Sequence, residues 1–168
     1  MPHRHVALLR GINVGTSVRL PMADLRAIVE AAGGTDVATY LQSGNVVFTA
    51  SPGSDALDAP ALEAAIPVTT RVLILTEAEF RAVAAENPLR DIATNPSRLF
   101  TTFVDAVPAS FDLPDLAPEV VVVGRRAVYQ WLPEGFGTSV FAAKYSKKLG
   151  PLATARNERT VQAILGML

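Results

Sequence analysis

The predicted order of strands and helices occurs twice along the chain, once on each side of residues 87–97. Before this segment, apolar and β-branched runs alternate with amphipathic stretches in the order β-α-β-β-α-β, and a further helix follows. After it the same order returns with a weaker first helix, and a terminal helix again follows. A split β-α-β arrangement of this kind is typical of ferredoxin-like folds. We therefore predict an α+β protein made of two ferredoxin-like (βαββαβ) halves in tandem.

The segment 87–97 is the predicted linker because it combines asparagines and prolines with little hydrophobic periodicity. It separates an N-terminal half, residues 1–86, from a C-terminal half with its terminal helix, residues 98–168. The predicted strands are 5–9, 37–42, 45–49, 68–75, 99–104, 119–123, 127–132 and 152–155. The predicted helices are 22–32, 60–66, 77–86, 139–149 and a last one capped by Asn157. Loops are predicted at 10–17 and 51–58.

Composition excludes several classes of protein and of site. Hydrophobic residues make up 49% of the 168 residues and charged residues 18%, which excludes a disordered chain. Cysteine is absent and the two histidines, His3 and His5, lie at the N-terminus, so we expect no disulfide, no metal site and no cofactor. No apolar run approaches the ~20 residues that span a bilayer, and the start lacks a signal-peptide pattern. We therefore expect a cytoplasmic protein without a membrane partner.

Charge is distributed unevenly along the chain. Residues 1–29 and 140–168 carry an excess of basic side chains, whereas the stretch between them carries an excess of acidic ones. If the two basic ends meet in space, they favour the binding of an anion. The alternative is that these charges only solvate exposed faces.

The first polar segment with candidate ligand-binding residues is RGINVG, residues 10–15, directly after the predicted strand 5–9. Its glycines, Gly15 among them, allow backbone N–H groups to approach an anion, and Arg10 adds positive charge. The spacing matches neither the dinucleotide fingerprint nor the Walker pattern. The alternative is an ordinary turn in which Asn13 bonds to its own backbone.

The second segment is YLQSGN, residues 40–45, at a predicted hairpin. A ligand could contact Gln42, Ser43 and Asn45. The alternative, which we favour for this segment alone, is that Ser43 and Asn45 close the turn.

The third segment is TARNERT, residues 154–160, where the last helix begins. The N–H groups of a helix N-terminus attract anions, and Arg156 and Asn157 are the candidate ligands there. The alternative is that Asn157 is an N-cap and that Glu158 already complements the helix dipole.

The sequence contains no recognisable catalytic motif. It therefore does not decide whether the protein is an enzyme. A Ser–His–Asp triad would need His3 or His5, and no acidic pair belongs to a recognisable motif. Our first hypothesis is a binding module for a small ligand that carries a phosphate or a carboxylate. An enzyme acting on such a ligand, and a protein that binds nucleic acid through its basic ends, are the alternatives. The identity of the ligand and the oligomeric state stay open.

Three runs of the sequence together resemble a bacterial family known as domain of unknown function 1697. They are residues 8–15 (LLRGINVG), 39–48 (TYLQSGNVVF) and 154–157 (TARN). The resemblance implies a cytoplasmic protein of two similar α+β halves without an established activity. It also implies a role for the residues that recur in its pattern: Arg10, Asn13, Ser43, Asn45, Arg156 and Asn157. Glu158 departs from the family pattern, which has an aromatic residue at this position.

Overall fold

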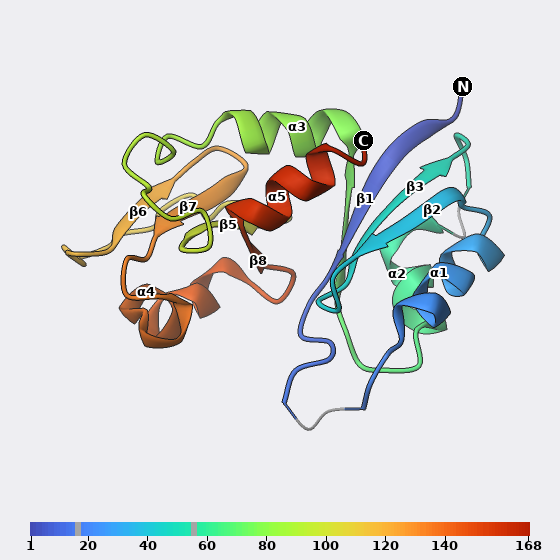
Figure 1. Cartoon of the computed structure of the whole chain (residues 1–168), viewed down its shortest axis with the longest axis horizontal. Coiled ribbons are helices and arrows are strands. Elements are labelled where there is room, and N and C mark those ends of the chain that lie inside the picture. The colour runs from blue at the N-terminus through green and yellow to red at the C-terminus, as the bar shows by residue number, and fades with distance from the viewer. Residues whose placement is uncertain (16–17, 55–56) are drawn as a thin grey trace. The chain divides into compact units, whose positions relative to one another are not determined.

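The computed structural model describes residues 1–15, 18–54 and 57–168 (Figure 1). These residues form a mixed α+β fold with two four-stranded antiparallel sheets. They group into two compact units, one of residues 1–81 with 163–168 and one of residues 82–162. The predicted loops at 10–17 and 51–58 contain residues 16–17 and 55–56, which lie outside the described residues.

The first sheet has the strand order β2-β3-β1-β4. Its strands are β1 (His3–Leu9), β2 (Thr35–Tyr40), β3 (Asn45–Ala50) and β4 (Val72–Thr76). Helix α1 (Met22–Ala31) connects β1 to β2, and helix α2 (Ala59–Ala65) connects β3 to β4. Both helices pack on the same face of the sheet (Figure 1). The buried residues of α1 recur at helical spacing and join the alternate, inward-facing residues of β1 and β3 in one apolar core.

The second sheet repeats this order as β6-β7-β5-β8. Its strands are β5 (Leu99–Phe103), β6 (Val120–Val123), β7 (Ala127–Trp131) and β8 (Thr154–Asn157). Between β7 and β8 lie the 3-10 turn η2 (Phe136–Thr138), helix α4 (Val140–Lys144) and the 3-10 turn η3 (Ser146–Leu149). Helix α3 (Glu77–Ala85) follows β4, and helix α5 (Glu158–Leu165) follows β8. No helix within the described ranges is long and apolar enough to cross a membrane.

The predicted helix at 139–149 is shorter in the structure than its sequence pattern suggests. Helix α4 starts at its cap Ser139, whose hydroxyl oxygen accepts the N–H of Ala142, but it ends at Lys144 and the 3-10 turn η3 follows. The hydroxyl of Ser146 donates to the carbonyl oxygen of Ala142 over 2.5 Å. A serine that bonds back to this carbonyl competes with the helical backbone, and this competition accounts for the break.

Two predicted helix starts carry the capping contacts that their sequences indicate. At α3, the Thr76 hydroxyl oxygen accepts the N–H of Glu79 (3.2 Å), and the Glu79 carboxylate accepts the N–H of Thr76 (2.9 Å). At α5, the Asn157 side-chain oxygen accepts the N–H of Thr160 (3.0 Å). These contacts fix the first turns of both helices.

Tyr129 anchors β7 to α3. Its side chain is 1% exposed, and its hydroxyl donates to the carbonyl oxygen of Val83 over 2.7 Å. Burial, helped by the negative charge of Glu86, raises the pKa of Tyr129 from 10.0 to about 12. The folded protein therefore holds this proton more tightly than the unfolded chain does.

This pKa difference predicts a loss of stability at alkaline pH. The contribution of Tyr129 is complete below about pH 10 and falls by roughly 2–3 kcal/mol as the pH rises to about 12. Tyr129→Phe removes this part of the pH dependence and, at neutral pH, costs about 1–3 kcal/mol because the Val83 carbonyl loses its partner. Urea denaturation of both proteins between neutral and alkaline pH measures the difference. Parallel stability curves for the two proteins would contradict the prediction.

Candidate functional site

The loop after β1 has an unusual backbone. Gly11, Asn13 and Gly15 have φ angles of 67°, 56° and 58°, so every second residue of the loop is left-handed. Glycine adopts this conformation without strain, and asparagine tolerates it better than most residues. In an anion-binding nest, left-handed residues alternate with right-handed helical ones, and the left-handed residues of this loop have that spacing.

Asn13 holds the loop in place. Its side-chain nitrogen donates to the carbonyl oxygens of Leu20 (2.9 Å) and Gln42 (2.8 Å), and its side-chain oxygen accepts the N–H of Leu20 (2.7 Å). The Arg19 guanidinium in turn donates to the backbone carbonyl of Asn13 over 2.8 Å. The Asn13 side chain thus bonds to the backbone of residues 20 and 42 rather than to its own, and it joins the first polar segment to the second.

The turn between β2 and β3 packs directly against the end of β1. The N–H of Leu9 donates to the carbonyl of Gly44 over 2.9 Å. Asn45 is fully buried, and its side-chain nitrogen donates to the carbonyl of Tyr40 (2.8 Å) and to the hydroxyl of Ser43 (3.1 Å). These contacts show Ser43 and Asn45 closing the turn. Gln42 has an exposed side chain, and its carbonyl accepts the Asn13 bond.

A hollow of about 330 Å³ lies beside the loop, between the loop and the chain that enters β4. Its lining consists of Gly11, Ile12, Val18, Pro67, Val68 and Thr69. The two sides are tied together because the N–H of Arg10 donates to the Arg71 carbonyl (3.0 Å) and the Thr70 hydroxyl donates to the Arg10 carbonyl (2.8 Å). A volume of this size suits a small ligand.

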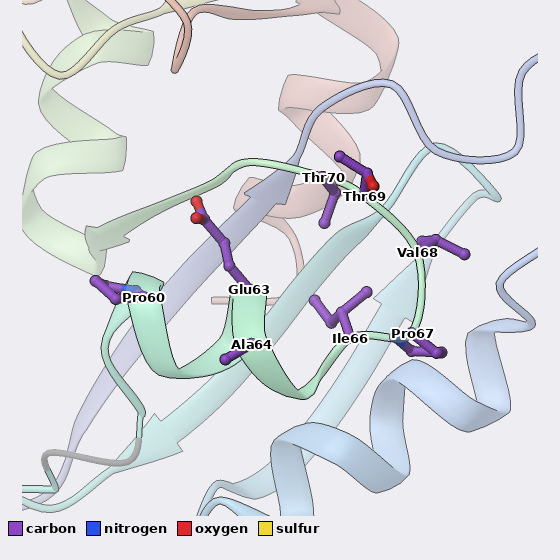
Figure 2. Close-up of a pocket in the computed structure, with 8 residues that line it drawn as sticks. All are labelled: Pro60, Glu63, Ala64, Ile66, Pro67, Val68, Thr69 and Thr70. Carbon is purple, nitrogen blue, oxygen red and sulfur yellow. The ribbon is translucent and has the colours of Figure 1, made fainter.

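A second hollow, of about 540 Å³, shares the lining residues Pro67, Val68 and Thr69 with the first (Figure 2). Figure 2 shows it bordered by α2 and by the connection from Ile66 to Thr70, with the Glu63 side chain extending from α2. The Glu63 carboxylate accepts the N–H of Val72 (2.8 Å) and the Nε–H of Arg71 (3.1 Å). A carboxylate in the wall disfavours an anion, and the lining residues of the smaller hollow include no carboxylate.

The third predicted segment belongs to the unit of residues 82–162. Arg156 lies on β8, is 7% exposed, and donates to the Thr154 hydroxyl (2.6 Å) and the Ala155 carbonyl (2.9 Å). Burial lowers the pKa of this arginine from 12.5 to about 10. Asn157 caps α5, as described above. The convergence of this segment with the 10–15 loop stays a prediction.

Glu158 has partners that explain a carboxylate at the start of α5. Its side chain is 10% exposed, and it accepts from Arg90 (3.0 Å) and from the side-chain amide of Gln162 (2.8 Å). The acid is thus engaged by a cation and an amide and also complements the helix dipole.

Three residues near the 10–15 loop were not predicted from the sequence: Arg19 and Arg71, which bond to the loop, and Thr69, which lines the smaller hollow. Arg19 belongs to the basic N-terminal stretch, but only the structure brings its guanidinium to the carbonyl of Asn13. Thr69 and Arg71 reach the loop because β1 and β4 are neighbours in the sheet. Among residues 1–15, 18–54 and 57–168, no cluster of acidic and histidine side chains could hold a metal ion.

The comparisons with known proteins agree with this architecture. The structure is similar to that of a conserved bacterial protein from Streptococcus pneumoniae, with 26% sequence identity, a TM-score of 0.74 and coverage of 99% of each chain. None of the curated proteins compared matches the chain. Residues 2–129, which include the 10–15 loop and the 40–45 turn, match the family described as "Protein of unknown function (DUF1697)". The chain therefore belongs to this family.

Proposed function

We propose that this protein binds a small ligand through a phosphate or carboxylate group, in the hollow beside the 10–15 loop. The observation that carries the proposal is the alternation of left-handed residues at Gly11, Asn13 and Gly15. Alternating left-handed residues are the pattern in which an anion-binding nest turns its N–H groups to one side. Gly11 also lines the hollow. A fixed set of backbone donors binds an anion without the entropy cost of ordering long side chains.

The charges around the loop support the same proposal. Arg10 begins the loop with an exposed side chain, and Arg19 is held at the loop by its bond to Asn13. The Arg71 carbonyl accepts the N–H of Arg10, so the two residues lie side by side on neighbouring segments. The Glu63 carboxylate, 3.1 Å from the Arg71 Nε, partly offsets the charge of Arg71. A guanidinium binds phosphate and carboxylate oxygens in a bidentate manner, so Arg10 is the side chain we assign to the ligand.

We further propose that each sheet with its helices is a ferredoxin-like half. The strand orders β2-β3-β1-β4 and β6-β7-β5-β8 support this proposal. In both sheets the first strand of the half lies between the third and the fourth, and the second strand is at the edge beside the third. In the first half two helices fill the connections, as a βαββαβ unit requires. In the second half, the connection from β5 to β6 has no helix, and α4 with its flanking 3-10 turns occupies the connection from β7 to β8.

A thermal-shift titration with inorganic phosphate, pyrophosphate, a sugar phosphate and citrate tests the binding proposal. A ligand at about 100 times its dissociation constant adds roughly 2.7 kcal/mol to the free energy of unfolding, which raises the melting temperature measurably. Arg10→Ala is expected to abolish the shift. Arg125→Ala is the matched control, because Arg125 is 83% exposed and lies in the other unit, and it should keep the shift.

Two outcomes would overturn the proposal. One is a protein that no ligand of either class stabilises. The other is a shift that Arg10→Ala and Arg125→Ala retain equally, which would place the anion elsewhere. A short oligonucleotide in the same series tests the nucleic-acid alternative, whose signature is a steep fall of affinity with salt.

A further inference from the structure

The hollow beside the 10–15 loop has a wall made mainly of hydrocarbon. Its lining comprises one glycine, one threonine and four apolar residues: Gly11, Thr69, Ile12, Val18, Pro67 and Val68. No charged side chain is among the described residues that line it. Ligand pockets of proteins commonly have such a wall, in which a few polar groups fix the orientation of the ligand.

Val18 lines the hollow without belonging to the core. Its side chain is 77% exposed, whereas Ile12 is buried and belongs to the apolar core of the first sheet. Val68 is half-buried and packs against the same core. Single exposed apolar residues are common on protein surfaces and need no explanation. Here the exposed valine instead shares one concavity with buried and half-buried apolar residues, so an occupant of the hollow would cover it.

Positive charge adjoins the hollow only where the 10–15 loop begins. Arg10 has an exposed side chain and directly precedes Gly11, which lines the hollow. The Glu63 carboxylate lines the larger hollow and is not among the lining residues of this one. Figure 2 shows the Val68 side chain pointing away from Glu63. An anionic group at the loop therefore leaves the apolar wall to the rest of the ligand.

The composition of this wall discriminates between classes of anion. A sugar phosphate or citrate carries hydroxyl or further carboxyl groups, which lose water when they enter an apolar hollow. Each such group that finds no hydrogen-bond partner there weakens binding. Thr69 supplies the one side-chain hydroxyl of the described lining. An alkyl or aryl group gives up no hydrogen bond to water and gains from the removal of its surface from water.

We propose that the ligand of this site is an amphiphilic anion, in which a phosphate or carboxylate is joined to an alkyl or aryl body. This inference rests on the function proposed above and adds the class of the ligand. The anionic group lies at the 10–15 loop and at Arg10, and the apolar body lies against Val18, Pro67 and Val68. The volume of about 330 Å³ is near the lower end of the range for ligand pockets, so the body is short.

Isothermal titration calorimetry of the full chain with matched pairs of anions tests the proposal. Pentyl phosphate is compared with glycerol phosphate, and pentanoate with glycerate, because the members of each pair have equal numbers of non-hydrogen atoms and differ in the polarity of the body. Each buried methylene strengthens binding roughly fourfold, so the apolar member is expected to bind at least about tenfold more tightly. Its binding should also have the more negative heat-capacity change, which marks the burial of apolar surface.

Val18→Thr combined with Val68→Thr tests where the apolar body lies. Each substitution replaces a methyl group by a hydroxyl group of similar size, and the pair should lower the preference for the apolar anion at least about threefold. Val123→Thr combined with Val140→Thr is the matched control, because these two valines are 36% and 41% exposed and lie in the other unit. The preference is a ratio of two dissociation constants of one protein, so a loss of folded protein does not imitate the effect.

The outcomes separate this inference from the function on which it rests. If neither inorganic phosphate nor any of the paired anions binds, the anion site and the inference both fail. If an anion binds but the polar member of its pair binds at least as tightly as the apolar one, the anion site stands and the inference is overturned. An apolar preference that survives Val18→Thr with Val68→Thr would overturn it as well, because the apolar body would then lie elsewhere.

Discussion

Gly44→Ala is expected to lower the free energy of unfolding by about 2–5 kcal/mol. Gly44 has a φ angle of 85°, which costs an alanine about 1–2 kcal/mol. An added Cβ would also lie 2.7 Å from Leu9 Cβ and 2.8 Å from Ile12 Cδ1, and such overpacking adds about 1–3 kcal/mol. Urea denaturation at neutral pH measures the loss. The same clash displaces Ile12, so we expect weaker anion binding as well.

Gly53→Ala is the matched control for this substitution. Gly53 has a nearly equal φ angle of 82°, but no heavy atom of the described residues lies within 4 Å of the position that an added Cβ would take. Its cost should therefore come from the backbone conformation alone, about 1–2 kcal/mol. Equal losses for the two variants would show that the close packing of the turn against β1 does not contribute.

Asn13→Ala is expected to cost about 2.5–6.5 kcal/mol and to abolish anion binding. The substitution removes three hydrogen bonds, each worth about 0.5–1.5 kcal/mol, and places alanine at a φ angle of 56°. Without the bonds to Leu20 and Gln42, the loop is no longer held in the conformation that turns its N–H groups together. Denaturation and phosphate titration of the same protein measure the two effects.

Asn13→Gly separates the hydrogen bonds from the backbone strain. Glycine adopts the left-handed conformation freely, so this variant loses the three bonds without the cost of strain. It should be more stable than Asn13→Ala and still bind phosphate more weakly than the unsubstituted protein. Unchanged phosphate affinity in Asn13→Gly would contradict the role of Asn13 in positioning the loop.

Local sequence patterns predicted most of the secondary structure because each element carries its own signals. The buried face of α1 recurs at helical spacing, and the capping box at Thr76 and Glu79 marks the start of α3. The prediction of one helix over residues 139–149 was wrong in its second half, because α4 ends at Lys144 and a 3-10 turn follows. There the hydroxyl of Ser146 takes the carbonyl that the helix would use, an alternative that apolar periodicity does not reveal.

The candidate site was predictable only in part. The glycines and Asn13 of the 10–15 loop are visible in the sequence because they break the strand pattern. Thr69 and Arg71 were not, since they reach the loop only through the pairing of β1 with β4, a contact between residues far apart in the chain. For Asn45, the turn-closing alternative is the one that the hydrogen bonds support, whereas Asn13 bonds to residues 20 and 42 rather than to its own backbone.

The most direct test of the anion site is an amide NMR titration of the protein with inorganic phosphate and pyrophosphate. We predict that the backbone N–H resonances of residues 11–15 shift with a saturable dependence on ligand concentration. The resonances of the 51–54 turn, which also contains a left-handed glycine, Gly53, should stay in place. Loop resonances that do not move at any phosphate or pyrophosphate concentration would contradict the account.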